Sequence, residues 1–218
     1  MMKRIKKTSV LRAQIVPNVT QFYRDFLDIP RDHQSIGFLS TDCEEVLYLA
    51  LDDATKKADV KVAFVNSAHV GLGNLWAHER GVVIGMLSGS KVQDVRMGML
   101  YAKDFIERHS NYYMFDEDED RYCYAHLIPR SGPYYLEKYQ IPPESAVAHL
   151  SAEPVAATYA LDQALKTGDT RIAHLYRIPT KTNMGGGILY GTESACRAAA
   201  KAFLNAVEYC YDNPMEIG

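Results

Sequence analysis

Two short motifs in the sequence have the spacing of a serine nucleophile and a lysine base. Ser88 and Lys91 fit the pattern S-x-x-K, and residues 166–168 read K-T-G, in the order in which certain serine acyl-transfer enzymes carry them. Here no S-D-N motif lies between them, and the K-T-G motif ends a predicted helix. We therefore keep an enzymatic or small-molecule-binding regulatory domain only as an alternative.

Two other groups of polar residues could hold an ion. His69 and His78, together with Glu79, lie in one predicted loop and could gather around a threefold axis to bind a metal. Residues 116–120 alternate Asp and Glu, but they lack the glycine and the distant glutamate of a calcium loop. Histidines and acids in loops are normally solvated, so we expect neither a metal nor another cofactor.

The composition is that of a globular protein and argues against nucleic-acid and membrane partners. Of the 218 residues, 47% are hydrophobic, enough for one large core or two smaller ones. A formal net charge of −3 gives no footprint for nucleic acid, and no segment reads as a membrane span. Residues 1–7 read as a basic tail. Four cysteines without C-x-x-C spacing suit a reducing cytoplasm.

The chain contains an internal repeat. With a shift of 110 residues, Ala50, Leu51, Asp52, Ala54, Lys56 and Asp59 fall on Ala160, Leu161, Asp162, Ala164, Lys166 and Asp169. With a shift of 102 residues, Gly85, Leu87 and Gly89 fall on Gly187, Leu189 and Gly191. The first copy has about eight extra residues, within residues 66–80. Such a chain is better suited to assembling or surrounding something than to holding one asymmetric active site.

Both copies read as the same series of elements. Alternating or apolar runs predict strands at residues 9–16, 35–40, 60–65 and 82–87, and again at 122–128, 146–150, 171–176 and 188–190. Helices are predicted to start at Thr41, Ser90, Ser151 and Glu193. The last two strands of each copy are joined by links too short for a crossover helix, which favours antiparallel pairing. We predict an α/β fold of the α+β type, with mainly antiparallel sheets flanked by helices, in two domains, 1–112 and 113–218.

Over nearly its whole length the sequence resembles the EutL family, the tandem-domain shell proteins of ethanolamine-utilising bacterial microcompartments. The likeness is carried by QSIGFLSTD at 34–42, DDATKKA at 52–58, RSG at 130–132, ATYALD at 157–162 and YGT at 190–192. The resemblance implies two circularly permuted shell domains, a homotrimer shaped as a flat pseudo-hexamer, a gated central pore and small pores within each subunit. It also implies other shell proteins as partners in a two-dimensional sheet, and no catalytic residues.

In this family, acids and an aromatic side chain in the small pore bind ethanolamine. The resemblance places Glu44 and Glu45 where the family has aspartates, Tyr112 where it has phenylalanine, and Val82 where it has glutamate. Carboxylates and an aromatic face attract an ammonium group, so the lost acid predicts weak binding of ethanolamine. The alternative is that Glu44 and Glu45 only stabilise a helix start, where the helix dipole favours acids.

Two lysines and two loops complete the predicted functional residues. Lys56 and Lys166 correspond to the edge lysine that packs against its counterpart in a neighbouring tile; the alternative is a pair of solvated helical lysines. The resemblance places the loops 66–80 and 180–187 around the central pore, and their glycines lower the cost of moving the backbone. The residues singled out there are His69, Gly71, Gly73, Trp76, Asn183, Gly185, Gly186 and Gly187.

The sequence therefore predicts a trimeric shell protein that passes small metabolites, with Trp76 as the plug of a movable gate. One alternative is a shell protein of another compartment, of the alcohol or choline type. The three glycines at 185–187 could also cradle a phosphate, but no P-loop lysine accompanies them and a strand follows; closely approaching backbone is the other explanation.

Overall fold

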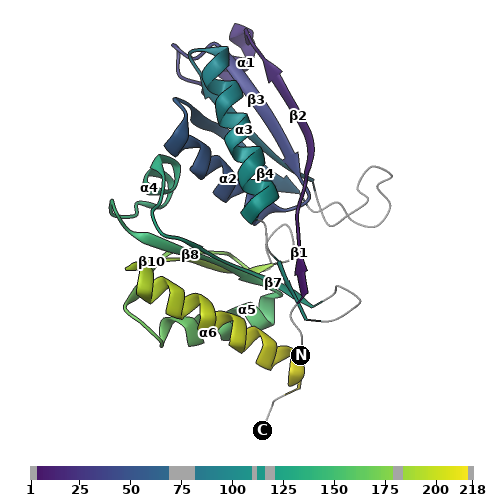
Figure 1. Ribbon diagram of the computed structural model, residues 1–218, viewed down its shortest axis with the longest axis vertical. Helices are drawn as coiled ribbons and strands as arrows, with labels where there is room; N and C mark the ends of the chain where they lie inside the picture. The colour runs from purple at the N-terminus through teal and green to yellow at the C-terminus, as the bar shows by residue number, and fades with distance from the viewer. Residues whose placement is uncertain (1–3, 69–81, 110–111, 116–120, 179–183, 216–218) are drawn as a thin grey trace. The chain divides into compact units, whose positions relative to one another are not determined.

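The computed structural model describes residues 4–68, 82–109, 112–115, 121–178 and 184–215 (Figure 1). The chain forms two compact units. The N-terminal unit contains Thr8–Ser110 and Gly132–Tyr135, and the C-terminal unit contains Met1–Lys7, Asn111–Ser131 and Leu136–Gly218. Compared with the predicted domains 1–112 and 113–218, residues 1–7 and 111–112 belong to the C-terminal unit, and residues 132–135 belong to the N-terminal unit.

The N-terminal unit is a four-stranded sheet with two long helices on one face (Figure 1). Its strand order is β2 (Val10–Val16), β3 (Ser35–Thr41), β5 (Val82–Gly89) and β4 (Lys61–Ala68), and every pair is antiparallel. Helices α2 (Glu44–Lys57) and α3 (Val92–His109) bury the apolar positions that the periodicity predicts. A short helix, α1 (Gln21–Phe26), precedes β3.

The C-terminal unit is a six-stranded antiparallel sheet. Its order is β1 (Arg4–Lys6), β6 (Tyr112–Met114), β7 (Tyr122–Ile128), β8 (Ala146–Ala152), β10 (Gly185–Gly191) and β9 (Thr170–Leu175). Helices α5 (Pro154–Leu165) and α6 (Glu193–Asp212) pack against each other and against one face of this sheet (Figure 1). Their contact surfaces are rich in alanine, which lets the two helices approach closely. Helix α4 (Pro133–Tyr139) lies between β7 and β8 in the sequence.

The predicted repeat and the antiparallel α+β fold are confirmed. The spatial order β2-β3-β5-β4 in one unit matches β7-β8-β10-β9 in the other. The long helices also follow equivalent strands in the chain: α2 follows β3 as α5 follows β8, and α3 follows β5 as α6 follows β10. In the part of the chain that the structure describes, no disulfide joins the cysteines. Among the described residues, no helix has the length and hydrophobicity that a membrane span requires.

Three local predictions were wrong. Residues 4–6 form β1, which pairs with β6, and so are not a free basic tail. The N-cap of α2 is Cys43, whose sulfur accepts a hydrogen bond from the Val46 amide, because the Thr41 hydroxyl is already bonded to the Cys43 backbone. The N-cap of α5 is Glu153, since Ser151 is still a buried strand residue.

Candidate ligand site and assembly surfaces

The start of α2 holds both acids of the predicted small pore. Glu45 is buried, and its Oε2 lies 3.6 Å from the Cys43 thiol, which donates to it. Glu44 is half-buried in the same first turn. Their position also fits the alternative that both acids only stabilise the start of the helix, because acids in the first turn interact favourably with the helix dipole.

Tyr48 joins this pair of acids, although the sequence analysis missed it. It lies one turn after Glu44 on α2, and its phenol is hydrogen-bonded to the Glu44 carboxylate. Burial, and then the charges of Glu44 and Glu45, raise the pKa of Tyr48 well above its usual value. The phenol therefore stays neutral and can donate a hydrogen bond. The i, i+4 spacing from Glu44 was the signal that could have revealed it.

Tyr112 and Val82 lie on strands in different units. Tyr112 is on β6 of the C-terminal unit, with its ring centroid 5.3 Å from that of Tyr124 and 5.6 Å from that of Tyr122. Val82 begins β5 of the N-terminal unit, where its backbone pairs opposite Ala68. Whether Tyr112, Val82 and the two glutamates line one pore stays a prediction.

Lys56 is held by acids of its own helix. Its Nζ lies 3.4 Å from Asp52 Oδ2 and 3.8 Å from Asp53 Oδ1, and its side chain is only 25% exposed. Asp52 is fully buried and accepts hydrogen bonds from the backbone amides of Gly132 (2.8 Å) and Tyr135 (2.9 Å), at the start of α4. Burial raises the pKa of Asp52, while Lys56 and the two amides oppose that rise.

Lys166, the repeat equivalent of Lys56, is placed differently. It follows the last turn of α5 and pairs with Asp162, the equivalent of Asp52. Both side chains are solvent-exposed, that of Lys166 by 63%. The repeat therefore keeps the ion pair but buries it in only one copy, so Lys166 is the lysine better able to contact another molecule.

The three glycines predicted to lie in a pore loop belong to a strand instead. Gly185, Gly186 and Gly187 open β10 and pair with Ala152, Ser151 and Leu150 of β8. Gly186 has φ of 125°, and a Cβ there would lie 2.1 Å from the Leu150 carbonyl oxygen. The close approach of the β8 backbone therefore explains why glycines occupy these positions, which was the alternative to a phosphate cradle.

Several predicted residues lie outside the described residues. These are His69, Gly71, Gly73, Trp76 and Asn183 of the pore loops, the proposed metal group His78 and Glu79, and the acidic run at 116–120. Within the described ranges, no group of three or more His, Cys, Asp or Glu side chains is arranged to hold a metal ion.

The residues of the serine-lysine motif do not form an accessible site. Ser88 is completely buried in β5, and its hydroxyl is 2.9 Å from Nδ1 of the buried His33. Residues 166–168 follow α5 in the C-terminal unit, outside any strand. A substrate could not reach the Ser88 hydroxyl without opening the core.

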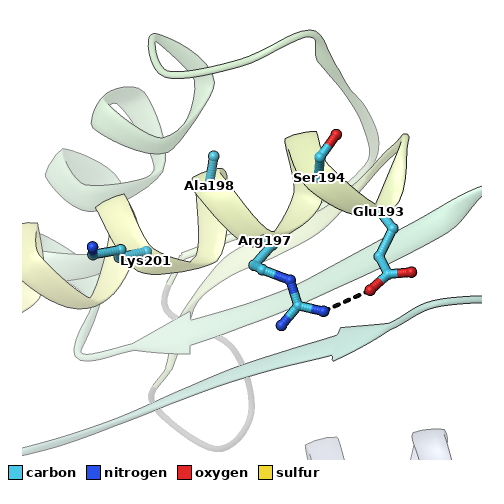
Figure 2. A pocket seen from close by; sticks show the side chains of 5 residues that line it. All are labelled: Glu193, Ser194, Arg197, Ala198 and Lys201. Carbon is cyan, nitrogen blue, oxygen red and sulfur yellow. Dashed lines mark hydrogen bonds and ion pairs between the residues drawn. The ribbon is translucent and has the colours of Figure 1, made fainter.

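The exposed start of α6 forms a hollow of about 660 Å³ (Figure 2). Its lining is Glu193, Ser194, Arg197, Ala198 and Lys201, all from this one helix. Arg197 points back toward Glu193 and pairs with it at 2.6 Å (Figure 2). Because no second element converges on the hollow, we assign it no ligand.

One buried histidine distinguishes the face of the C-terminal sheet opposite α5 and α6. His149 on β8 is fully buried, and its Nε2 shares a very short hydrogen bond with the Tyr176 hydroxyl. Burial, followed by the positive charge that His126, His174 and Lys138 can carry, lowers the pKa of His149 to about 3. This imidazole is therefore neutral throughout the physiological range.

Comparison with known proteins gives long, consistent similarities. The chain is 37% identical over 209 residues to the bacterial microcompartment shell protein EutL of Clostridium perfringens, and 31% identical over 210 residues to EutL of Escherichia coli. Each alignment covers 96% of both chains. The crystal structure of the ethanolamine utilization protein EutL from Leptotrichia buccalis superposes with a TM-score of 0.94 at 42% identity, over 99% of this chain and all of that one. No family model matches the sequence.

Two fused units with one antiparallel strand order and one arrangement of helices, matched over their full length by shell proteins, define a tandem-domain shell protein of a bacterial microcompartment. Identity above 30% over almost the entire chain then specifies the family. The chain belongs to the EutL family.

Proposed function

We propose that this shell protein has no chemistry of its own and that three copies close into a pseudo-hexameric tile with a gated central pore. The observation that carries the proposal is the match to EutL proteins over 96% of both chains. The repeat supports it, because three chains with two similar units each supply six similar positions around one axis. The predicted loop 66–80, with Trp76, would form the gate.

The mass of the assembly tests this proposal. Light scattering on the purified protein should give about 73 kDa, three times the chain mass of 24.5 kDa. A mass that stays at one chain at micromolar concentration would contradict it.

The metabolite that fits the proposed small pore is a small amine or another small cation. Glu44 and Glu45 would attract the cation, and the Tyr48 ring and hydroxyl would lie beside it. The Glu44–Tyr48 hydrogen bond already satisfies one carboxylate, and Val82 supplies no acid. Binding of ethanolamine should therefore be weak, and another small polar metabolite, from an alcohol or choline compartment, is the alternative.

Titration calorimetry with ethanolamine tests the ligand proposal. We expect weak heats for the unmodified protein and roughly tenfold tighter binding for Val82→Glu, which restores a carboxylate. The control is Lys61→Glu, which adds a carboxylate at an exposed position of the neighbouring strand β4, at the end of that strand far from the residue that pairs with Val82. Tight ethanolamine binding by the unmodified protein would show that Val82 does not limit the site.

A further inference from the structure

The short helices α1 and α4 are equivalent parts of the repeat. Helix α1 lies between β2 and β3 as α4 lies between β7 and β8. With a shift of 112 residues, Pro17, Tyr23, Ile29 and Pro30 fall on Pro129, Tyr135, Ile141 and Pro142. Shortly after each helix comes one residue with left-handed backbone, Asp28 with φ of 50° and Gln140 with φ of 53°. The contacts of one of these helices are therefore a guide to the contacts of the other.

The two helices differ in how far they are covered. Tyr135 of α4 is completely buried, and Asp52 of α2 binds the start of that helix, all within the N-terminal unit. Tyr23, the counterpart of Tyr135 on α1, is 52% exposed. Phe22 and Phe26 are 71% and 73% exposed, and their rings stack with centroids 6.2 Å apart. These three aromatic side chains form an exposed patch, and such patches often mark contacts with another molecule.

Helices α2 and α5 show the same difference. Both bury equivalent core faces, but α2 also buries a second face, which holds Glu45, Leu49 and Asp52. The counterparts on α5, at a shift of 110 residues, are the exposed Val155, Tyr159 and Asp162. Val155 is 76% exposed and Tyr159 is 42% exposed. A hollow of about 410 Å³ opens beside this face, and Val155, Tyr159 and Tyr209 are among the residues that line it.

We propose that the aromatic patch of α1 in one copy packs on the exposed face of α5 in the next copy, with Phe22 and Tyr23 against Val155 and Tyr159. The inference rests on the trimer proposed above. A second copy is the occupant because the start of α4 lies on α2, so the equivalent α1 fits the equivalent face of α5. The contact joins two different surfaces of the chain, and three such head-to-tail contacts close a ring.

The contact at α5 is wider than its counterpart at α2. A Cβ on Gly132 would lie 2.6 Å from the Asp52 carbonyl oxygen, and α1 has Thr20 at the position of this glycine. The short bond between a backbone amide and a carboxylate is therefore not repeated, and Asp162 keeps its pairing with Lys166. The aromatic and apolar side chains of α1 and α5 fill the wider gap and provide the contact area instead.

Thiol cross-linking tests the pairing. A Cβ on Gly132 would lie 2.9 Å from Asp52 Cγ, so the equivalent positions Thr20 and Asp162 should be within reach of a short linker. We expect Thr20→Cys with Asp162→Cys to give covalent dimers and trimers when treated with a short bismaleimide. The background is Cys210→Ser, because Cys210 is the one cysteine of the four that is not fully buried.

The outcomes separate this inference from the proposed trimer. The control pair, Thr20→Cys with Ser194→Cys at the exposed start of α6, should remain single chains. If light scattering gives no trimer for the unmodified protein, the proposed function fails. If the trimer forms but the Thr20–Asp162 pair gives no links, or only links within one chain, the packing of α1 on α5 is refuted.

Truncation of the two tyrosines gives a second test, read as the loss of trimer mass on dilution. Tyr23→Ala and Tyr159→Ala should each weaken the trimer about tenfold, because each removes a large side chain from the contact. The double variant should lose less than the product of the two effects, since both remove one shared contact. Leu100→Ala, which shortens an exposed apolar side chain on α3, is the control. Effects of the two tyrosine variants that multiply independently, or no effect at all, would contradict the contact.

Discussion

At the scale of single residues, Asp52 links helix α2 to the start of α4. Its carboxylate caps the start of α4 through two amides and also pairs with Lys56, and a Cβ on Gly132 would lie 2.6 Å from the Asp52 carbonyl oxygen. The sequence singled out this aspartate only as a member of the repeat. Its bonding depends on contacts between residues 80 or more positions apart, which no local pattern reports.

We predict that Asp52→Asn destabilises the protein by about 1–3 kcal/mol, because one buried amide then faces an NH₂ group instead of an oxygen. Urea unfolding measures the change. Asp162→Asn is the matched control from the other copy, and its exposed ion pair should contribute less than about 1 kcal/mol. Equal losses for the two variants would contradict the assigned role of Asp52.

At the scale of elements, the long strands and helices were predictable and the short ones were not. Periodicity located α2, α3, α5 and α6, because each buries one face over many residues. The central strands were located by their apolar runs, since β8 is buried along its whole length. Strands β1 and β6 have three residues each, and β1 exists through pairing with β6 across more than a hundred positions. The glycines at 185–187 were assigned to a loop because a run of glycines is typical of loops. In the structure these glycines lie in β10, where they allow the backbone of β8 to approach closely.

In the candidate site, too, features with a local sequence signal were predictable and features that depend on burial were not. The positions of Glu44 and Glu45 in a first helical turn were predictable, since helix starts have local signals. The contribution of Tyr48 and the difference between the two lysines depend on burial, which the repeat alone could not show. The site residues on loops 66–80 and 180–183 stay predictions.

The C-terminal sheet should lose stability in acid through His149. Its pKa is lowered to about 3 from 6.5, so between these values the unfolded chain binds a proton that the folded sheet does not. The contribution of His149 to the free energy of unfolding is fully present above about pH 6.5 and declines as the pH falls. Between pH 6.5 and pH 5 the loss should be about 2 kcal/mol.

Urea unfolding monitored between pH 7 and pH 5 checks this expectation. His149→Gln should be less stable at pH 7, because the Tyr176 hydroxyl loses its imidazole partner, but its stability should depend less on pH. His109→Gln, with an exposed imidazole on α3, is the control and should keep the full pH dependence. If the unfolding free energy of His149→Gln depended on pH as steeply as that of the unmodified protein, His149 would not be the group responsible.

At the scale of the whole molecule, the two copies have diverged in what they offer to neighbours. Lys166 is exposed at the end of α5, whereas Lys56 is held by Asp52 and Asp53. We predict that Lys166→Asp abolishes two-dimensional sheets while leaving trimers intact, because the variant removes the long side chain and the cation that balances Asp162 and leaves two acids at the tile edge. Lys56→Asp should also lose stability, because it places a third acid beside the other two. If Lys166→Asp still formed normal sheets in electron micrographs, Lys166 would be a solvated residue with no role at the tile edge.

The central claim is that the chain closes into a threefold tile with a six-lobed outline. Electron microscopy of the purified, unmodified protein measures this directly, through two-dimensional class averages viewed down the particle axis. We predict flat particles with threefold symmetry, six lobes and a central opening or plug, formed by three chains of two similar units each. Single-chain particles, or rings with twofold or fourfold symmetry, would contradict the account.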